Sequence, residues 1–268
     1  MVSIIISFYE RLHHLRLCLD SLNWNREDFD EVLIADDGSS EVTVRGIEEL
    51  IVGYDFPVRH VWQPKKGFRL AASRNNAIRK SRGDYLVFLD TDFVVLPDAI
   101  RHHREAAAPG IFVAALCKYL DHSQTERLFS EGLSSESLQA LYRQLPEKPL
   151  KREHFRFVKY ELLIRLRLAG ARKQRCSSHF SIHRKDMEAI NGYDENFVGW
   201  GGEDEDLALR MVKAGFRGRS IIPQARTLHL WHPKELGNRH WQEGCNVAYL
   251  NRKSVSFRCE KGLRRQEP

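Results

Sequence analysis

The sequence lacks the features that mark membrane, secreted and disulfide-rich proteins. It contains no run of about 18 apolar residues, so no transmembrane helix is expected. Residues 1–7 carry neither a basic leader nor a cleavage site, and they predict a first strand rather than a signal peptide. The five cysteines are odd in number, scattered and without CxxC spacing. This pattern favours a reducing cytoplasm with buried thiols over disulfides or a zinc site.

The sequence also lacks the phosphate-binding glycines that many nucleotide-binding folds use. No glycine-rich dinucleotide fingerprint follows the first predicted strand, and no P-loop is present. Strands predicted at 2–6, 31–35, 58–62 and 84–89 nevertheless alternate with helices predicted at 10–22, 42–52 and 68–79. This alternation predicts an α/β fold with a mostly parallel central sheet flanked by helices. Ligands of such sheets bind beyond the carboxyl ends of the strands, and a metal held by acids is the expected way to neutralise a diphosphate there.

Two carboxylates follow the fourth predicted strand. Asp90 and Asp92 are separated by one residue, and in extended backbone such positions point the same way. Two converging carboxylates repel each other unless a cation lies between them, and oxygen ligands suit Mg²⁺ or Mn²⁺. The alternative interpretation is a helix cap, because Pro97 opens a predicted helix shortly afterwards.

Residues 199–206 read Gly-Trp-Gly-Gly-Glu-Asp-Glu-Asp, a glycine-rich turn followed by four acids. Apolar residues then recur at helical spacing, so the acids are placed on the first turn of a helix, whose positive end stabilises anions. The glycines allow positive φ and a close approach of a ligand to the backbone. A charged helix start after a flexible turn is the alternative. The tryptophan between the glycines favours a catalytic edge, with Trp200 as a wall for a ring-shaped ligand.

Two histidines, His229 and His232, lie near the end of a strand predicted at 227–231. At positions i and i+3, close to the predicted acids, they are candidate nitrogen ligands of a metal. The alternative is a pair of ordinary core or surface histidines.

The positive charge of the chain is concentrated in one segment. The net charge is +6, whereas residues 151–175 hold nine Lys/Arg and two acids, a local balance of 9 − 2 = +7. In the same segment Phe155, Val158, Leu162, Leu163, Leu166 and Ala169 recur at steps of three and four. The pattern predicts an amphipathic basic helix, either an ordinary surface helix packed on the core or one that contacts anionic lipid headgroups or an acidic acceptor.

The remaining elements are predicted from periodicity and turn signals. We expect a helix at 97–107, a strand at 111–116, helices joined by loops within 122–150, and a strand followed by a helix within 178–190. A helix at 203–214, a strand at 216–222 and a closing helix at 234–250 complete the prediction, with a basic, frayed end beyond.

These motifs together resemble nucleotide-sugar-dependent glycosyltransferases of the GT-A (Rossmann-like) fold, family 2. The resemblance rests on Ser-Ile-Ile-Ile-Ser-Phe-Tyr, Ala-Asp-Asp-Gly-Ser, Ala-Ala-Ser-Arg-Asn, Leu-Asp-Thr-Asp and the 199–206 stretch, which is similar to the galactosyltransferase and chondroitin-polymerase subgroup. It covers residues 1–95 and 178–233. It implies one GT-A domain over 1–268, with a nucleotide-binding half at 1–95, a helical acceptor- or membrane-side insert at 96–177, and an acceptor and catalytic half at 178–268.

The resemblance also implies roles for individual residues. It places Ser7 and Asp37 at a uracil-type base, Arg74 and Asn75 in the nucleotide pocket with Lys66 and Arg69 nearby, Asp90 at the ribose and metal, and Trp200, Gly201 and Gly202 beside both sugars. It implies metal ligation by Asp92 with His229 and His232, a catalytic base at Asp204, and a sugar contact at Glu203. The usual Tyr-Asn after the first strand is Tyr9-Glu10 in this sequence.

The activity implied is Mn²⁺- or Mg²⁺-dependent, inverting transfer of a hexose or N-acetylhexosamine. The donor is a nucleotide sugar, with UDP as the expected nucleotide, and the acceptor is a hydroxyl of a glycan or lipid-linked oligosaccharide in surface polysaccharide synthesis. We expect a cytoplasmic protein, peripheral to the inner membrane face through 151–175, with no nucleic acid partner. Three alternatives remain: a nucleotide-sugar hydrolase, a nucleotidyltransferase, whose glycine-rich lysine loop is missing, and a non-enzymatic module that binds anionic surfaces.

Overall fold

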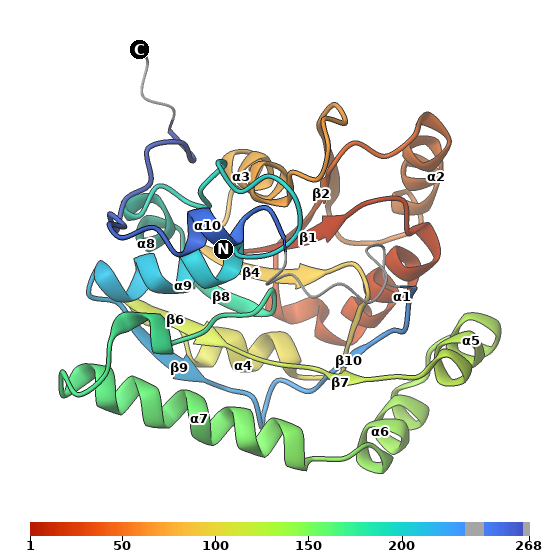
Figure 1. Cartoon of the computed structure of the whole chain (residues 1–268). Helices are drawn as coiled ribbons and strands as arrows, with labels where there is room; N and C mark the ends of the chain where they lie inside the picture. The colour runs from red at the N-terminus through yellow and green to blue at the C-terminus, as the bar shows by residue number, and fades with distance from the viewer. Residues whose placement is uncertain (234–243, 265–268) are drawn as a thin grey trace.

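The computed structural model describes residues 1–233 and 244–264, which are built around a seven-stranded sheet (Figure 1). Its strands are β1 (Val2–Phe8), β2 (Glu31–Asp36), β3 (Val58–Trp62), β4 (Tyr85–Asp90), β6 (Ile111–Ala114), β8 (Phe180–His183) and β9 (Arg217–Ser220). They lie in the order β3-β2-β1-β4-β8-β6-β9. Only β8 runs antiparallel to its neighbours, β4 and β6. The predicted mostly parallel sheet is confirmed.

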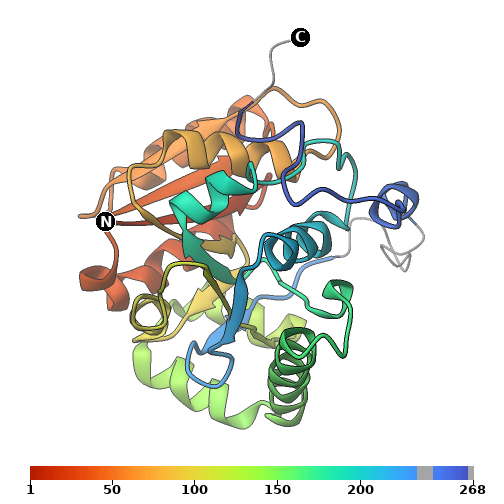
Figure 2. The same cartoon turned by 90° about the vertical axis from the view of Figure 1, so that its left-hand side faces the viewer.

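Helices cover both faces of this sheet (Figures 1 and 2). They are α1 (Leu12–Leu22), α2 (Glu41–Ile51), α3 (Leu70–Lys80), α4 (Ala99–Glu105), α5 (His122–Glu131), α6 (Ser135–Gln144), α7 (Lys148–Arg165), α8 (Arg184–Ala189), α9 (Glu203–Lys213) and α10 (Val247–Leu250), with short 3-10 helices η1 (Asn23–Asp28) and η2 (Ala171–Lys173). Local capping defines several starts: Ser40 accepts from Thr43 N at α2, and Asp121 and Gln124 form a capping box at α5. None of the helices in the described ranges has the length and apolar character needed to span a membrane.

The alternation of side chains along the strands produces two cores, one on each face. Ile4 and Ile6 of β1 face a cluster that includes Leu15 of α1 and Ile47 of α2. Ile5 faces the opposite way, into a cluster with apolar side chains of α3, α8 and α9, namely Ala77, Met187 and Leu207. β1 is buried along its whole length, which explains why its sequence is almost continuously apolar. The second of these cores holds α3 and α9 on the same face of the sheet.

A second, three-stranded sheet lies beside the first. It consists of β5 (Phe93–Val95), β10 (Thr227–His229) and β7 (Lys118–Tyr119), with β10 in the middle. His229 is paired in register with Phe93 on one side and Tyr119 on the other. A third apolar cluster packs residues of α5, α6 and α7 against this sheet. The small sheet thereby brings the end of β4, the segment around Tyr119 and the end of β10 to one place.

Several predicted boundaries change in the structure. The helix expected over 151–175 is α7, which ends at Arg165, and the strand expected over 216–222 covers only Arg217–Ser220. The segment 96–177 contributes β6 to the central sheet and β7 to the small sheet, besides its helices. Of the closing helix expected at 234–250, residues 234–243 lie outside the described residues, and the rest contains the short α10. All five cysteines are free, and four are buried; Cys245 is exposed, contrary to the prediction.

The apolar stripe predicted on 151–175 does not pack on the core. Phe155, Val158, Leu162 and Leu166 are exposed, whereas Phe157 is buried on the other side of α7. α7 does pack on the core as a surface helix, but through Leu150 and Phe157 and not through this stripe.

Candidate functional site

Arg74 of α3 joins three elements at the carboxyl end of the central sheet. Its guanidinium is fully buried and donates from Nε to Ser7 Oγ at 2.8 Å, from Nη2 to Asp90 Oδ1 at 3.1 Å and from Nη1 to Asp204 Oδ1 at 3.0 Å. Burial alone would lower the pKa of Arg74, but the neighbouring acidic groups outweigh it and raise that pKa. The contacts bring β1, β4 and the first turn of α9 together, so predicted residues from distant parts of the sequence meet at one arginine.

The first turn of α9 holds its acids in a buried setting. Desolvation, with the charge of Asp204 next in effect, raises the pKa of Glu203 to about 8, and Arg74 only partly opposes the rise. Desolvation and the charge of Asp90 also raise the pKa of Asp204, against the lowering effect of Arg74. The sequence predicted that the helix end would stabilise these carboxylates as anions; burial has the larger effect. Glu203 is thus protonated at neutral pH, and its Oε2 has no hydrogen-bond partner among the described residues.

Asp206, the last of the four acids, forms structural ion pairs with two arginines. It is completely buried, and its two oxygens accept from Arg210 Nε at 2.6 Å and Arg252 Nη2 at 2.8 Å. Arg210 also donates to the carbonyl of Ile190 at 3.0 Å. Asp206 therefore anchors α9 to its surroundings and belongs to the framework of the site.

The glycine loop before α9 depends on backbone conformations that other residues rarely adopt. Gly199, Gly201 and Gly202 have φ of +94°, +87° and +94°. Asn246 donates to the carbonyls of Gly199 and Gly201 at 3.0 and 2.8 Å, which fixes the loop. Trp200 remains exposed at the tip. This arrangement agrees with an aromatic side chain presented to a ligand.

Asp92, His229 and His232 converge on one point, and each offers one ligand atom within 4.8 Å of the other two. Asp92 Oδ1 lies 3.6 Å from His229 Nε2, and Oδ2 lies 3.2 Å from His232 Nε2. Asp92 directly precedes β5 and His229 ends β10, so the small sheet creates the cluster. Burial works against ionisation of Asp92, but the hydrogen bond from His232 and the nearby cationic groups lower its pKa overall.

The cluster fits a divalent cation. Asp92 is buried, and its Oδ1 has no hydrogen-bond partner among the described residues, which is costly unless another group binds it. A carboxylate with two imidazoles suits Mn²⁺ better than Mg²⁺, which prefers oxygen ligands alone. Asp92, His229 and His232 would hold the ion, with room in its coordination shell for substrate oxygens.

Residues that the sequence analysis did not single out surround this cluster. Arg11 Nη1 donates to Asp92 Oδ2 at 3.2 Å, and the Tyr119 ring lies 4.7 Å from that of His229. Arg11 belongs to the segment before α1 and Tyr119 to β7. Neither lies in a recognisable motif; only the pairing of β7 with β10 places Tyr119 beside His229.

The residues predicted to bind the nucleotide differ in how far they are buried. Asp37 is buried and accepts from Gln63 Nε2 at 2.7 Å and from the backbone N of Arg69 at 2.6 Å. Lys66 is exposed on the loop between β3 and α3, which also carries Gln63 and Arg69. Gln63 is a contact that the sequence analysis missed.

Asn75 lies further from any open surface than expected. It is fully buried, donates to the carbonyl of Tyr193 at 2.9 Å and to Glu195 Oε1 at 3.1 Å, and accepts from Tyr193 N. Its amide anchors the turn before the glycine loop to α3.

Glu10, which stands where the resembled family usually has asparagine, contacts the N-terminal end of α2, which Ser40 caps. It has φ of +56°, and its carboxylate accepts from Ser40 N at 2.6 Å and from the hydroxyls of Ser40 and Thr43. The side chain therefore ties the end of β1 to the start of α2.

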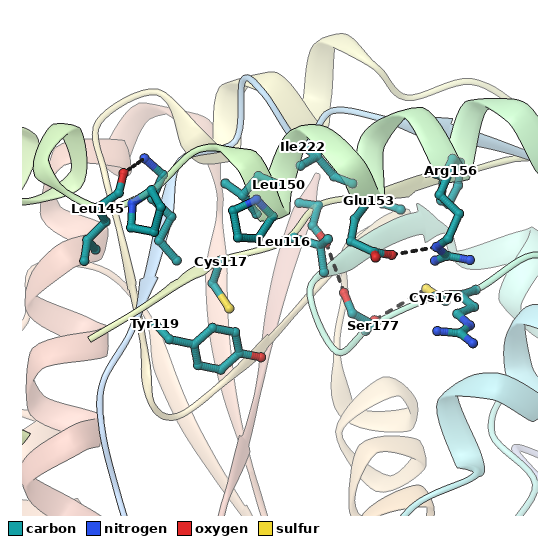
Figure 3. A pocket seen from close by; sticks show the side chains of 17 residues that line it. Leu116, Cys117, Tyr119, Leu145, Leu150, Glu153, Arg156, Cys176, Ser177 and Ile222 are labelled. Carbon is teal, nitrogen blue, oxygen red and sulfur yellow. Dashed lines mark hydrogen bonds and ion pairs between the residues drawn. The ribbon is translucent and has the colours of Figure 1, made fainter. Parts of the chain in front are cut away.

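A pocket of about 440 Å³ lies between α7 and the segment from β6 to β7 (Figure 3). Its lining is mainly apolar, with Leu150 and Phe157 from α7 and Cys117 and Ile222 opposite. None of the predicted site residues lines it. Tyr119 connects the two regions, since it borders the pocket and its ring lies against that of His229 at an interplanar angle of 34°.

The residues around Arg74 and the Asp92–His229–His232 cluster are neighbours at the end of β4. Asp90 belongs to the Arg74 contacts with Ser7 and Asp204, and Asp92, two residues later, belongs to the cluster with the histidines. The structure thus brings Ser7, Arg74, Asp90 and Asp204 together, and separately Asp92, His229 and His232, at one edge of the sheet.

Two sequence families match the chain. Residues 3–175 match the family described as glycosyl transferase family 2, and residues 162–233 match the one described as the N-terminal domain of galactosyltransferase. The first match covers more than half of the chain.

Among curated proteins the chain is similar to a chondroitin synthase of Escherichia coli, with 28% identity over 237 residues, 82% of this chain and 33% of the synthase. It is also 28% identical over 264 residues to the validoxylamine A glucosyltransferase of Streptomyces hygroscopicus subsp. jinggangensis, covering 94% of this chain and 59% of that enzyme. The chain therefore spans between a third and three-fifths of the length of these relatives.

The fold is similar to that of a mannosyltransferase from Pyrobaculum calidifontis, solved in complex with GDP-Man and Mn²⁺. The TM-score is 0.57 at 15% identity, over 87% of this chain and 58% of that one. At this identity the likeness establishes the GT-A-like fold alone.

Proposed function

Because this chain belongs to glycosyl transferase family 2, we propose that it transfers a sugar from a nucleotide sugar to a hydroxyl group. The proposed donor is a UDP-hexose or UDP-N-acetylhexosamine. The observation that supports this most is Arg74, which links the acid proposed as the base, Asp204, to Asp90, two residues from the candidate metal ligand Asp92. A donor bound over the end of β4 would lie between the base and the cation.

Asp204 is the proposed general base. Its raised pKa makes it a better proton acceptor than an ordinary aspartate, and Arg74 fixes the orientation of the carboxylate. Asp204 would take the proton of the acceptor hydroxyl, which attacks the anomeric carbon from the face opposite the leaving nucleotide. One in-line displacement of this kind inverts the anomeric configuration.

Glu203 and Trp200 are proposed to position the sugars. Glu203 is neutral at pH 7 and has an unused oxygen, so it is able to donate a hydrogen bond to a sugar hydroxyl. The exposed Trp200 ring, flanked by glycines, offers a face for stacking. Gly201 and Gly202 supply the positive φ that the loop between Trp200 and the acids requires.

Asp92, His229 and His232 are the proposed ligands of Mn²⁺, which when bound supplies positive charge to the leaving diphosphate. We propose that the nucleotide is bound by Ser7, Asp37, Asp90, Arg69 and Lys66. Asp37 is the proposed contact of the uracil-type nucleobase. Asn75 would act only through the turn that it anchors.

The proposed acceptor is a glycan or lipid-linked oligosaccharide of a surface polysaccharide, and the proposed setting is the cytoplasm. The apolar pocket beside Tyr119 favours an acceptor with an apolar portion. A nucleotide-sugar hydrolase would use the same metal and acids, so acceptor dependence separates the two functions.

The test is a thermal-shift screen of UDP-, GDP- and dTDP-sugars with and without Mn²⁺, followed by nucleotide release with an acceptor panel. We expect a shift with UDP-sugars that requires Mn²⁺, and release that rises with acceptor. Release that no acceptor stimulates would favour the hydrolase, and the absence of any shift would contradict nucleotide-sugar binding altogether.

A further inference from the structure

The outward face of α7 carries an apolar stripe that no described residue covers. Phe155 is 70% exposed, Val158 47%, Leu162 55% and Leu166, just after the helix, 56%. These positions follow one another at steps of three, four and four, so at 3.6 residues per turn they share one side of the helix. Leu168 extends the exposed apolar surface beyond the helix end. Single exposed apolar side chains are common, but a continuous stripe marks an interaction surface.

The helix is held in place through its opposite face. Leu150 and Phe157 are buried there. His154 Nδ1 lies 2.9 Å from Ser220 Oγ, and Glu161 Oε2 accepts from Gly218 N at 3.0 Å and from Gln174 Nε2 at 2.9 Å. α7 is therefore docked on β9 and on the segment around Gln174 through one face, and its apolar stripe takes no part in these contacts.

Basic side chains flank the stripe. Lys151, Arg152, Lys159 and Arg165 are exposed on the helix, and Arg167, Arg172 and Lys173 are exposed just beyond it. Within the described ranges, Lys159, Arg165, Arg167 and Lys173 have no ion pair with an acid. An apolar stripe edged by unpaired lysines and arginines combines two attractions, burial of apolar surface and attraction to negative charge.

From this combination we propose that α7 lies in the headgroup layer of a bilayer that contains anionic lipids. A second copy of the chain is a poorer partner, because pairing two such faces would bring their positive charges together. A polyanion in water would use the basic residues but leave the apolar stripe exposed. An anionic bilayer satisfies both, and an 18-residue helix, about 27 Å long, lies readily in its plane.

This placement has a consequence for the pocket of Figure 3. Leu150, Glu153, Arg156 and Phe157 of α7 form one of its walls. With the outer face of α7 in the headgroup layer, that pocket lies directly above the membrane surface. A molecule whose apolar part is anchored in the bilayer would reach it past α7. The lipid contact itself requires neither the pocket nor any transferase activity.

The proposal is tested by flotation of the whole chain with vesicles of phosphatidylcholine alone and of phosphatidylcholine with phosphatidylglycerol. Three double variants are compared with the wild type: Phe155→Ser/Leu162→Ser on the stripe, Lys159→Gln/Arg165→Gln on its flanks, and the control Val42→Ser/Val52→Ser. The control removes two exposed valines from the region of α2, distant from α7 in Figure 1. Circular dichroism melts check that all variants fold.

We expect the wild type to bind anionic vesicles far better than neutral ones, and binding to fall with added salt. Each basic side chain near an anionic surface changes the partition coefficient roughly fivefold, so Lys159→Gln/Arg165→Gln should lower it by about 25-fold. The stripe variant should lose at least tenfold, because two large apolar side chains no longer enter the bilayer. The control should bind as the wild type does.

Other outcomes overturn the proposal. Equal binding of wild type and stripe variant would mean that the apolar side chains do not enter the bilayer, and that the surface recognises charge alone. Light scattering that shows a dimer in the wild type and a monomer in the stripe variant would make a second copy the partner. Because flotation uses no nucleotide sugar, these results are independent of the proposed transferase function.

Discussion

Arg74 and the two acids that share it decide the chemistry of the site at the level of single residues. The buried guanidinium of Arg74 pairs with both carboxylates and offsets part of their mutual repulsion, but burial and the charge of Asp90 still raise the pKa of Asp204. One of these carboxylates, Asp90, lies at the carboxyl end of β4, and the other, Asp204, lies on the first turn of α9. Of the two, Asp204 is the proposed proton acceptor, because its pKa is raised.

Replacing Asp204 by asparagine removes the proposed base while keeping the shape of the side chain. We expect kcat to fall by roughly 10²- to 10⁴-fold, the usual contribution of a general base, with donor affinity changed little. Steady-state kinetics and thermal shift with the donor measure the two effects. Glu205→Gln on the same turn is the matched control, and turnover as low as that of the Asp204 variant in this control would point to general disruption of α9.

The raised pKa of Glu203 predicts how the stability of the protein changes with pH. The pKa of Glu203 rises from 4.5 to about 8 on folding, because burial and Asp204 disfavour the charged form. Between these values the folded state holds a proton that the unfolded state has lost, so this group makes the protein less stable as pH increases from about 4.5 to about 8. Glu203→Gln should remove that loss. Between pH 4.5 and 8 the melting temperature of the variant should therefore rise relative to that of the wild type as pH increases. A constant difference between the two melting temperatures across this range would contradict the raised pKa of Glu203.

At the scale of elements, the first turn of α9 carries both the proposed base, Asp204, and an anchoring residue, Asp206, two positions later. Asp206 balances the charge of Arg210, which is completely buried. Asp206→Ala would leave that guanidinium without its partner, and loss of one member of a buried pair costs about 3–5 kcal/mol of unfolding free energy. Urea denaturation measures the change. The exposed pair Glu41–Arg45 provides the comparison, since Glu41→Ala should have little effect. Equal effects would show that Asp206 is not an anchor.

The order of elements was predictable because periodicity and turn residues are local signals. β1 to β4 and the helices between them were expected close to their observed bounds, and Asp92, His229 and His232 were expected as one metal set. The antiparallel insertion of β8 between β4 and β6 was not, because strand pairing depends on contacts distant in sequence. The same holds for Arg11 and Tyr119, which reach the metal cluster only through the small sheet.

α7 shows the limit of periodicity as evidence. The spacing of Phe155, Val158 and Leu162 correctly predicts a stripe on one side of a helix, but spacing carries no information on which side meets the core. The buried Phe157 and the bonds of His154 and Glu161 place the stripe outward. Burial likewise reverses the expected charge state of Glu203, since a helix end favours anions by less than desolvation disfavours them.

At the scale of the whole molecule, the candidate site lies at the carboxyl edge of the central sheet, and the proposed membrane face lies on α7, with the apolar pocket between α7 and Tyr119 (Figures 1 and 3). The proposed donor site, at the ends of β1, β2 and β4, is thereby separate from the apolar pocket, where an apolar part of the acceptor is proposed to bind.

The central claim is that a cation held by Asp92, His229 and His232 and a base at Asp204 act on one nucleotide sugar. The most direct measurement is the rate of nucleoside diphosphate release from a UDP-sugar with acceptor present, before EDTA treatment, after it, and after Mn²⁺ is restored. We expect release to stop with EDTA, to return with Mn²⁺ in the wild type, and not to return in Asp92→Asn. Undiminished, acceptor-stimulated release from EDTA-treated protein would contradict the central claim.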